Sequence, residues 1–525
     1  MNWFRIILSF GIGFLSFSSL GQEILIPLTS YSKDKALFAT NEKKVVGMGF
    51  FPISYTEAHL QFPQKDTAKT RNIFYRKLFK EHFVHQAGKK FLLAIDPLLD
   101  MQFGKEMLQR TYPYTYQNTK GAQALGEIGG IFSFYTAFYE NQARFVDYQS
   151  DYFISRGEYY TQNGNYIQDN ATIPNGGRTK PFKIGGFDYA SAVSYVRIKP
   201  IKQLAIQFGN MPRFFGWGYR SMLLSDNSYN YTNLAIDIEI IPGLTYTLMR
   251  GKQLNLIRKS ATNMVESPYE RKGIGVHYLS YKPIPSLVIG LFESTIYLRD
   301  TPSGTQRVNP LFYNPIIGIN TITKGGESKD MKNMIGLNIA WQIHSQHMIY
   351  AQAASDQFKH FQYGFQFGYR AGNIFNVQNL FFQLEGNIAS SDLYRANDIR
   401  MNYTHFNLPL AHTLGNGFKE VLVRASYLWK GLYVEGSVVY YHADQLMNNK
   451  VKLFIPSATD PNILHPNRVL NGTLEIGYEF NPATHLRVFV MANYYQRMSS
   501  LGNNINYGLV SIGLRSTLRN NYFDF

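Results

Sequence analysis

The segment from Arg213 to Asn227 carries the residues best suited to recognising a ligand. Two glycines flank a tryptophan, arginines lie on both sides of them, and an aspartate and an asparagine follow. Aromatic rings stack on sugar faces, while Arg, Asp and Asn side chains hydrogen-bond hydroxyl and carboxylate groups. We therefore predict a polysaccharide-binding site formed by Arg213, Trp217, Tyr219, Arg220, Asp226 and Asn227. The alternative is an inward-folded loop pinned by its own aromatic residues and an Arg–Asp pair.

Catalytic motifs are missing from the sequence. It contains no HExxH, no GxSxG, no phosphate-binding loop and no dinucleotide fingerprint. His442 and Asp444 lie two residues apart on one expected strand, where a hydrogen-bonded pair at the rim or in the lumen is the simpler interpretation. We predict a non-enzymatic protein without a cofactor and without a metal site.

Alternating short breaks and long polar segments divide most of the chain. The short breaks lie near Pro200, Pro242–Gly243, Pro283–Pro285, His344–Ser345, Gly372–Asn373, Lys430–Gly431 and Asn481–Pro482, and we expect another near Glu140. The long segments are 106–126, 150–186, 212–232, 251–271, 299–332, 391–419, 445–469 and 497–505, with a shorter one near 356–360. Short turns on one side and long loops on the other are typical of a membrane barrel.

The segments between the breaks alternate between apolar and polar residues. In 335–343, for example, Ile335, Leu337 and Trp341 share one face, and Asn338 and Gln342 share the other. This period of two places the two sets on opposite sides of a sheet. A β-sandwich would show the same alternation, but the rhythm of the connections favours a barrel. We predict an all-β, transmembrane, antiparallel up-and-down β-barrel of about 18 strands.

The composition agrees with an exported membrane barrel. Charged residues make up 17% of the 525 residues, aromatic residues 15%, and cysteine is absent. The aromatic residues suit girdles at both membrane surfaces. The formal net charge of +16 is spread over the chain, which argues against a nucleic-acid module. We expect contact with outer-membrane lipid, lipopolysaccharide or an acidic glycan, and no nucleic acid as a partner.

The N-terminus has the features of an export signal. Arg5 precedes the apolar stretch Ile6–Phe17, and Ser19-Leu20-Gly21 reads as a cleavage site. We therefore predict a signal peptide over 1–21, an N-terminal periplasmic region over 22–90 and an outer-membrane barrel over 91–525.

The N-terminal region, 22–90, should contain one helix. Its apolar residues between Asp66 and Gly88 recur at helical spacing, so we predict an amphipathic helix there. The helix could sit against the inner mouth of the barrel or pack on a small core of its own. We expect no large plug domain in this region.

The chain ends on Phe525, after an expected closing strand over 507–518. A terminal Phe resembles the insertion signal of outer-membrane barrels.

Several stretches resemble known families. Phe214–Tyr219, with Ser225–Asn227 downstream, resembles the signature of the Wzi-type capsule-assembly barrels, although Tyr219-Arg220 follows Gly218 where that motif reads closer to Trp-Gly-Pro-Gly. Further stretches resemble the RemB gliding-motility proteins of Bacteroidota, namely 116–121, 140–145, 309–315, 408–412 and 520–525. The Wzi-type resemblance implies an eighteen-stranded outer-membrane barrel that acts as a lectin for capsular polysaccharide. The RemB resemblance implies a role in surface gliding, with motility or envelope proteins as partners.

Together these features predict a binding protein in the outer membrane of a Gram-negative bacterium. It would hold cell-surface polysaccharide or support gliding. The alternative is a porin or channel for small polar solutes, with Asp237, Glu239 and Arg487 in a wet lumen. Conductance across a planar bilayer would separate these two functions.

Overall fold

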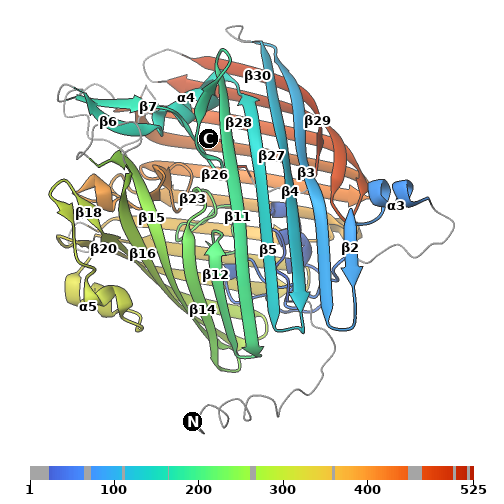
Figure 1. Ribbon diagram of the computed structural model, residues 1–525, viewed down its shortest axis with the longest axis horizontal. Coiled ribbons are helices and arrows are strands. Elements are labelled where there is room, and N and C mark those ends of the chain that lie inside the picture. The colour runs from blue at the N-terminus through green and yellow to red at the C-terminus, as the bar shows by residue number, and fades with distance from the viewer. Residues whose placement is uncertain are drawn as a thin grey trace, which may run out of the picture.

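The chain forms a closed antiparallel β-barrel of 18 strands (Figure 1). The computed structural model describes residues 23–63, 72–108, 113–162, 165–259, 268–357, 361–446, 464–499, 504–516 and 521–525. The barrel strands are β3 (Phe91–Glu106), β4 (Tyr114–Ile128), β5 (Phe132–Arg144), β11 (Gly186–Ile201), β12 (Leu204–Asn210), β14 (Thr232–Ile241), β15 (Leu244–Arg258), β16 (Tyr269–Ile284), β17 (Leu287–Leu298), β20 (Met331–His344), β21 (His347–Ser355), β22 (Tyr363–Ala371), β23 (Leu380–Ala389), β26 (Phe418–Trp429), β27 (Leu432–Leu446), β28 (Leu464–Asn481), β29 (Leu486–Ser499) and β30 (Ile505–Arg515). Pairing of β30 with β3 closes the ring.

Short turns join the strands at one end of the barrel and long connections join them at the other, as predicted. The short turns include 202–203, 242–243 and 430–431, and the long connections include 145–185, 299–330 and 390–417.

Two details of the predicted rhythm are wrong. β5 runs through Glu140, and the turn before it lies at Gly129-Gly130, where both residues have positive φ and form a tight connection. Most of the expected long segment 106–126 is β4. Its outward positions include Asn118 and Lys120, so the strand lacks a clear apolar face.

The alternating faces are confirmed. Ile335 and Trp341 on β20 are exposed on the outer wall, at 39% and 46%, whereas Asn338 and Gln342 face inward and are buried. An outward apolar surface meets lipid in a membrane barrel, and an inward polar surface meets a lumen or whatever fills it. Among the described residues, no helix is long and apolar enough to cross a membrane.

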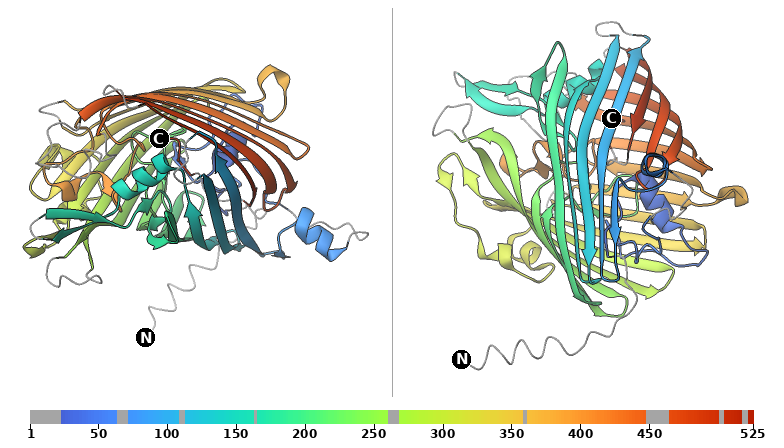
Figure 2. Two further views of the ribbon diagram at one scale, coloured as in Figure 1. Left: turned by 90° about the horizontal axis from the view of Figure 1, so that it is seen from above. Right: turned by 45° about the vertical axis from the view of Figure 1, so that its right-hand side comes forward.

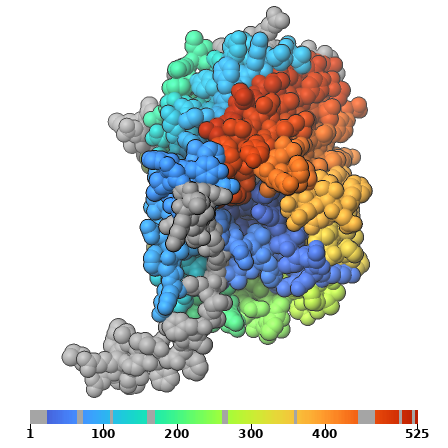
Figure 3. Space-filling view, turned by 90° about the vertical axis from the view of Figure 1, so that its right-hand side faces the viewer, coloured from blue at the N-terminus to red at the C-terminus, as the bar shows by residue number. Residues whose placement is uncertain are grey.

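Residues 23–62 lie inside the barrel, and we call them the plug. Glu23 pairs with the inward-facing Arg197 at 2.7 Å, and the Leu25 backbone N–H donates to the Tyr195 hydroxyl at 3.0 Å. In Figure 3 atoms of this segment, in dark blue, are visible below the red and orange residues and beside the yellow ones. The expectation that the region before the barrel holds no large plug is therefore wrong. Its apolar residues fall in short runs, such as Ile24–Ile26 and Ala36–Phe38, and none of these runs is long enough to indicate a packed body.

The plug contains helix α2 (Ser30–Leu37), which the sequence did not predict. The Thr29 hydroxyl caps its N-terminus by accepting a hydrogen bond from the Ser32 N–H. Asp34 on this helix pairs with Arg370 at 3.0 Å and with Arg424 at 2.5 Å. Both arginines project from the barrel wall and are almost fully buried, so the helix is held by charge in the middle of the lumen.

Three further segments fill the lumen from other directions. The connection 211–231 folds inward, and its β13 (Phe214–Phe215) pairs with β1 (Phe50–Phe51) of the plug. The connection 390–417 reaches the same region, because the Ser225 N–H donates to the Leu410 carbonyl at 2.7 Å. The C-terminal residues 521–525 also lie inside, and we call them the C-terminal tail.

One connection covers the outer wall instead. Residues 309–325, with helix α5 (Ile319–Lys324), lie beside the wall near β16 and β20 (Figure 1) and contact outward-facing polar side chains of β15 and β17. Glu293, fully buried at an outward position, accepts hydrogen bonds from the Gly318 and Thr321 N–H groups. Arg250 beside it donates to the Phe312 and Asn314 carbonyls. The cover thus keeps these polar groups from lipid, where unpaired polar groups are costly.

The predicted amphipathic helix is shorter than expected. Helix α3 spans Ile73–Phe79 and is capped by Asn72, whereas neither Asp66 nor Thr70 lies within the described residues. Beyond it, β2 (Val84–Ala87) pairs with β3. The helix stands beside the wall, outside the barrel (Figure 1 and the left view of Figure 2).

Candidate functional site

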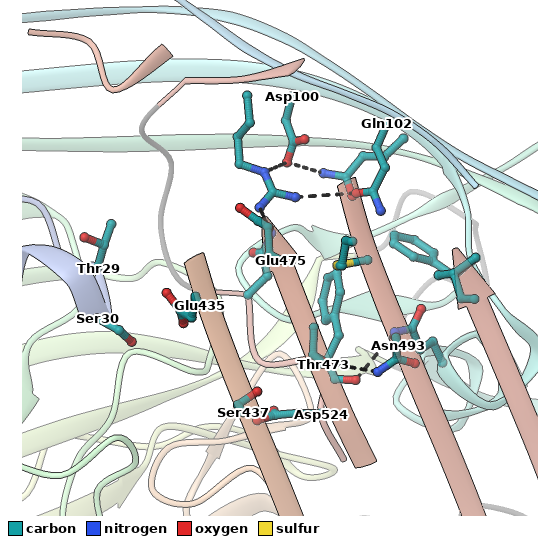
Figure 4. Close-up of a pocket in the computed structure, with 18 of the residues that line it drawn as sticks. Thr29, Ser30, Asp100, Gln102, Glu435, Ser437, Thr473, Glu475, Asn493 and Asp524 are labelled. Atoms are coloured by element: carbon teal, nitrogen blue, oxygen red, sulfur yellow. Dashed lines mark hydrogen bonds and ion pairs between the residues drawn. The ribbon is translucent and has the colours of Figure 1, made fainter. Parts of the chain in front are cut away.

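A polar cavity of about 280 Å³ lies in the lumen between the barrel wall, the plug and the C-terminal tail (Figure 4). The wall contributes inward-facing residues of β3, β4 and β27–β30. Helix α2 closes one side with the residues around Ser30, and the tail closes another with Asp524. The volume is near the lower end of the roughly 300–1,000 Å³ typical of small-ligand sites.

Ion pairs between arginines and carboxylates line the cavity wall. Arg515 bridges Asp100 at 3.1 Å and Glu475 at 3.0 Å, and Arg487 reaches the other oxygen of Glu475 at 3.0 Å. Arg424, which holds the plug, also pairs with Glu435 at 2.8 Å. Buried charges of this kind are tolerated because they are paired.

One acceptor among these groups has no partner. Asp100 is 1% exposed, and its Oδ1 has no hydrogen-bond partner among the described residues. Its Oδ2 accepts hydrogen bonds from Arg515 and from Gln117 at 3.0 Å. A buried carboxylate oxygen without a partner is costly, so Oδ1 is a natural acceptor for a ligand hydroxyl.

Aromatic rings supply the other part of the cavity lining. Tyr31 of the plug lies edge-on to Tyr433, with ring centroids 6.2 Å apart, and Arg487 covers the Tyr433 ring at 4.3 Å. Tyr219 enters from the inward-folded connection and meets Tyr522 edge-on at 5.4 Å. Rings beside charged and hydroxyl groups suit a ligand that is polar at its edge and apolar on its face.

The C-terminal tail forms a built-in wall of the cavity. Phe525 stacks on Tyr152 with ring centroids 3.7 Å apart, and Tyr152 belongs to helix α4 (Asp147–Ser155) of the long connection 145–185. The Tyr522 hydroxyl donates to Asp226 Oδ1 at 2.8 Å. Asp524 pairs with Arg220 at 3.2 Å. The resemblance of Phe525 to an insertion signal stays a prediction, but its ring packs in the lumen and not on the outer wall.

The six predicted ligand-binding residues lie in the connection 211–231, and five of them are buried. Arg213 makes a two-pronged ion pair with the wall residue Asp237, both contacts being 2.8 Å. Trp217 is 0% exposed beneath the plug, close to Gly49. The Asn227 side chain donates to the Pro409 carbonyl at 3.2 Å.

Arg220 links three parts of the lumen. It pairs with Glu420 on the wall and Asp524 on the tail, and its backbone N–H lies near Glu385. Burial alone would lower the pKa of the Arg220 guanidinium, but Asp524 and Glu420 raise it above its ordinary value. Arg220 is therefore charged, and it is paired with these two carboxylates.

Only Tyr219 of the six residues lines the polar cavity. The other five have contacts that fix the connection to the wall, the plug and the tail. Their assignment to ligand binding stays a prediction, because a glycan would reach them only after these segments moved.

The sequence did not single out Asp100, Glu435, Glu475 or Arg515, although it did place Arg487 in the lumen. They could have been found from the inward-facing positions of the predicted strands. Glu475 and Arg487, for example, occupy the polar face of strands that the alternation identified. What the sequence does not show is which inward positions the plug leaves uncovered. Among the described residues, no three His, Asp or Glu side chains are placed to hold a metal ion.

No protein-family model matches the chain, and no curated protein matches it significantly. Among solved structures, the chain is similar to Wzi, an outer membrane protein involved in group 1 capsule assembly in Escherichia coli and described as a carbohydrate-binding β-barrel. The two are 12% identical over 94% of this chain and 99% of Wzi, with a TM-score of 0.54.

Two further proteins of Pseudomonas aeruginosa are more weakly similar. OpdQ is 13% identical with a TM-score of 0.41, and OccK2 in complex with glucuronate is 9% identical with a TM-score of 0.43. Each match covers 81% of this chain and 98% of the other. The likeness to Wzi shows that this chain has the fold of a Gram-negative outer-membrane barrel.

Proposed function

We propose that this protein is a non-enzymatic barrel in the outer membrane of a Gram-negative bacterium, where it binds cell-surface polysaccharide. The observation that carries the proposal is the lumenal cavity, with its unpartnered Asp100 oxygen, its arginines and its tyrosine rings. Carboxylates accept from sugar hydroxyls, Arg side chains bind acidic sugar groups, and tyrosines stack on sugar faces. The carbohydrate binding of Wzi, which shares the fold, supports the proposal.

The filled lumen favours a binding protein over an open channel. The plug, the connections 211–231 and 390–417 and the C-terminal tail are each tied to the wall or to one another by the contacts described above. A porin needs a continuous water-filled path. We expect the purified protein to be silent in a planar bilayer, and steady porin-sized steps would favour the channel.

A cavity-filling substitution tests the proposed site without removing a known contact. Ser437 on β27 lines the cavity, and its side chain makes no hydrogen bond to another residue that the structure describes. Ser437→Phe should fill the cavity and abolish capture of the organism's own polysaccharide by the purified barrel. Val438→Phe is the matched control, because Val438 is the next residue on the strand and faces outward, 48% exposed. Equal capture by both variants would contradict the site.

The bound polysaccharide would serve either capsule assembly or gliding. Retention of capsule on cells that carry Ser437→Phe should fall if the protein acts in capsule assembly. Spreading on a surface should fall if it supports gliding. Unchanged retention and unchanged spreading, with normal levels of the variant in the outer membrane, would contradict both roles.

A further inference from the structure

We propose that helix α3 lies in the lipid headgroup region at the short-turn rim of the barrel and anchors the plug to the membrane from outside. This inference does not depend on the ligand of the lumenal cavity. Helix α3 has no buried residue. Ile73, Phe74 and Leu78 are 55%, 80% and 49% exposed, and Phe83 just beyond the helix is 59% exposed.

Such a helix needs a partner surface. Isolated helices shorter than about 12–15 residues are marginal in water, because few hydrogen bonds repay the cost of nucleation. Helix α3 has 7 residues. Its C-terminal end meets the barrel, where the Phe79 ring lies against Phe480. The aromatic side chains therefore need an apolar phase to cover them.

The position of α3 indicates which phase that is. The Phe79 ring lies 5.6 Å from the ring of Phe480, at the end of β28. The outward set of β28 includes Ile476 and Tyr478, which are 47% and 52% exposed on the lipid-facing wall. The Asn481 side chain donates to the Lys77 and Glu81 carbonyls at 3.1 and 3.2 Å and fixes the helix at this rim. The apolar side of α3 is thus continuous with the lipid-facing belt.

The charges around α3 complement a phospholipid surface. Residues 72–90 contain five cationic residues and one carboxylate, Glu81. Glu81 is fully buried, and Lys77 pairs with it at 3.2 Å. Aromatic and aliphatic residues beside Lys and Arg are typical of helices that lie in the membrane interface, where the cations approach lipid phosphates.

Helix α3 lies along the chain between the plug and the first barrel strand. Residues 23–62 lie in the lumen, α3 stands outside the wall, and β3 begins at Phe91 back in the barrel. The chain therefore passes from the lumen to the lipid side of the wall and then back into the barrel. Lipid that holds α3 thus also holds the part of the chain between the plug and the first barrel strand.

Because the chain lacks cysteine, single cysteines can be spin-labelled without background. Phe74→Cys and Leu78→Cys are labelled in the full-length barrel, reconstituted in vesicles that contain phosphatidylglycerol. Oxygen, which partitions into lipid, and a water-soluble nickel chelate are compared as relaxing agents. Ile476→Cys is the lipid-facing control, and Ser303→Cys, on an exposed connection, is the water-facing control.

We expect positions 74 and 78 to be several-fold more accessible to oxygen than to nickel, as at position 476. Nickel accessibility equal to that at position 303 would overturn the proposal. Protection from both agents would also overturn it, because a protein partner or a second copy would then cover the helix. Heat-modifiable migration on gels confirms that each labelled barrel is folded.

Discussion

Phe525, the last residue of the chain, stacks on Tyr152 inside the barrel with ring centroids 3.7 Å apart. The contact joins the C-terminus to helix α4 of a long connection, so both ends of the described chain lie within the lumen. The cavity is consequently enclosed by three separate parts of the sequence, namely the plug, the wall and the C-terminal tail.

Phe525→Ala tests whether the terminal ring acts in the lumen or in insertion. Because the ring is buried, we expect a loss of roughly 3–5 kcal/mol in local stability. The barrel itself should still assemble, and heat-modifiable migration measures this. Tyr313→Ala, on an exposed ring, is the control. Failure of the variant to reach the membrane would show that Phe525 serves as an insertion signal.

Asp34→Asn tests how the plug is held. The substitution leaves Arg370 without its charged partner and Arg424 with Glu435 alone. Breaking a buried pair of this kind typically costs about 3–5 kcal/mol. We expect the plug to loosen and the variant to show intermittent conductance in planar bilayers. Glu42→Gln, on the exposed part of the plug, should stay silent, and a silent Asp34→Asn variant would contradict this role.

Trp217→Ala and Tyr219→Ala separate packing from ligand contact. Trp217 is fully buried away from the cavity, so its removal should lower the thermal stability of the barrel, with a cost of roughly 3–5 kcal/mol. Tyr219 lines the cavity, so its loss should weaken polysaccharide capture more than stability. The opposite pattern, in which Trp217→Ala abolishes capture and leaves the melting temperature unchanged, would place the ligand on Trp217 itself.

Lys33 makes the stability of the plug depend on pH. Burial, with Arg370 nearby, lowers the pKa of Lys33 from 10.5 to about 7. Between these two values the unfolded chain binds more protons than the folded one, so stability should rise as the pH increases from about 7 to about 10. Thermal melts of the wild type and of Lys33→Met should diverge over this range. Parallel curves would show that Lys33 stays charged, supported by the Phe214 ring 3.4 Å away.

The barrel could be predicted from the sequence because lipid requires an apolar side chain at every second position of a membrane strand. Ile335, Leu337 and Trp341 meet this requirement, and so their strand was recognisable. β4 was missed because some of its outward-facing residues, such as Lys120, are not apolar. The turn at Gly129-Gly130 was missed with it.

The interior of the barrel could not be predicted in the same way. Asp34 pairs with Arg370 and Arg424, which are 336 and 390 residues away in the sequence. No local sequence pattern predicts such pairs. The connection 211–231 was recognised by its composition, yet composition alone does not decide whether Trp217 faces a ligand or a plug. The inward-folded alternative, pinned by an Arg–Asp pair, describes the observed contact between Arg213 and Asp237.

Calorimetric titration of acidic oligosaccharides, cut from the organism's own surface polysaccharide, into the purified barrel tests the binding claim most directly. We expect saturable binding to the wild type and to Val438→Phe, and at least a tenfold weaker affinity for Ser437→Phe. Equal affinity for all three proteins, or no binding to any of them, would contradict it.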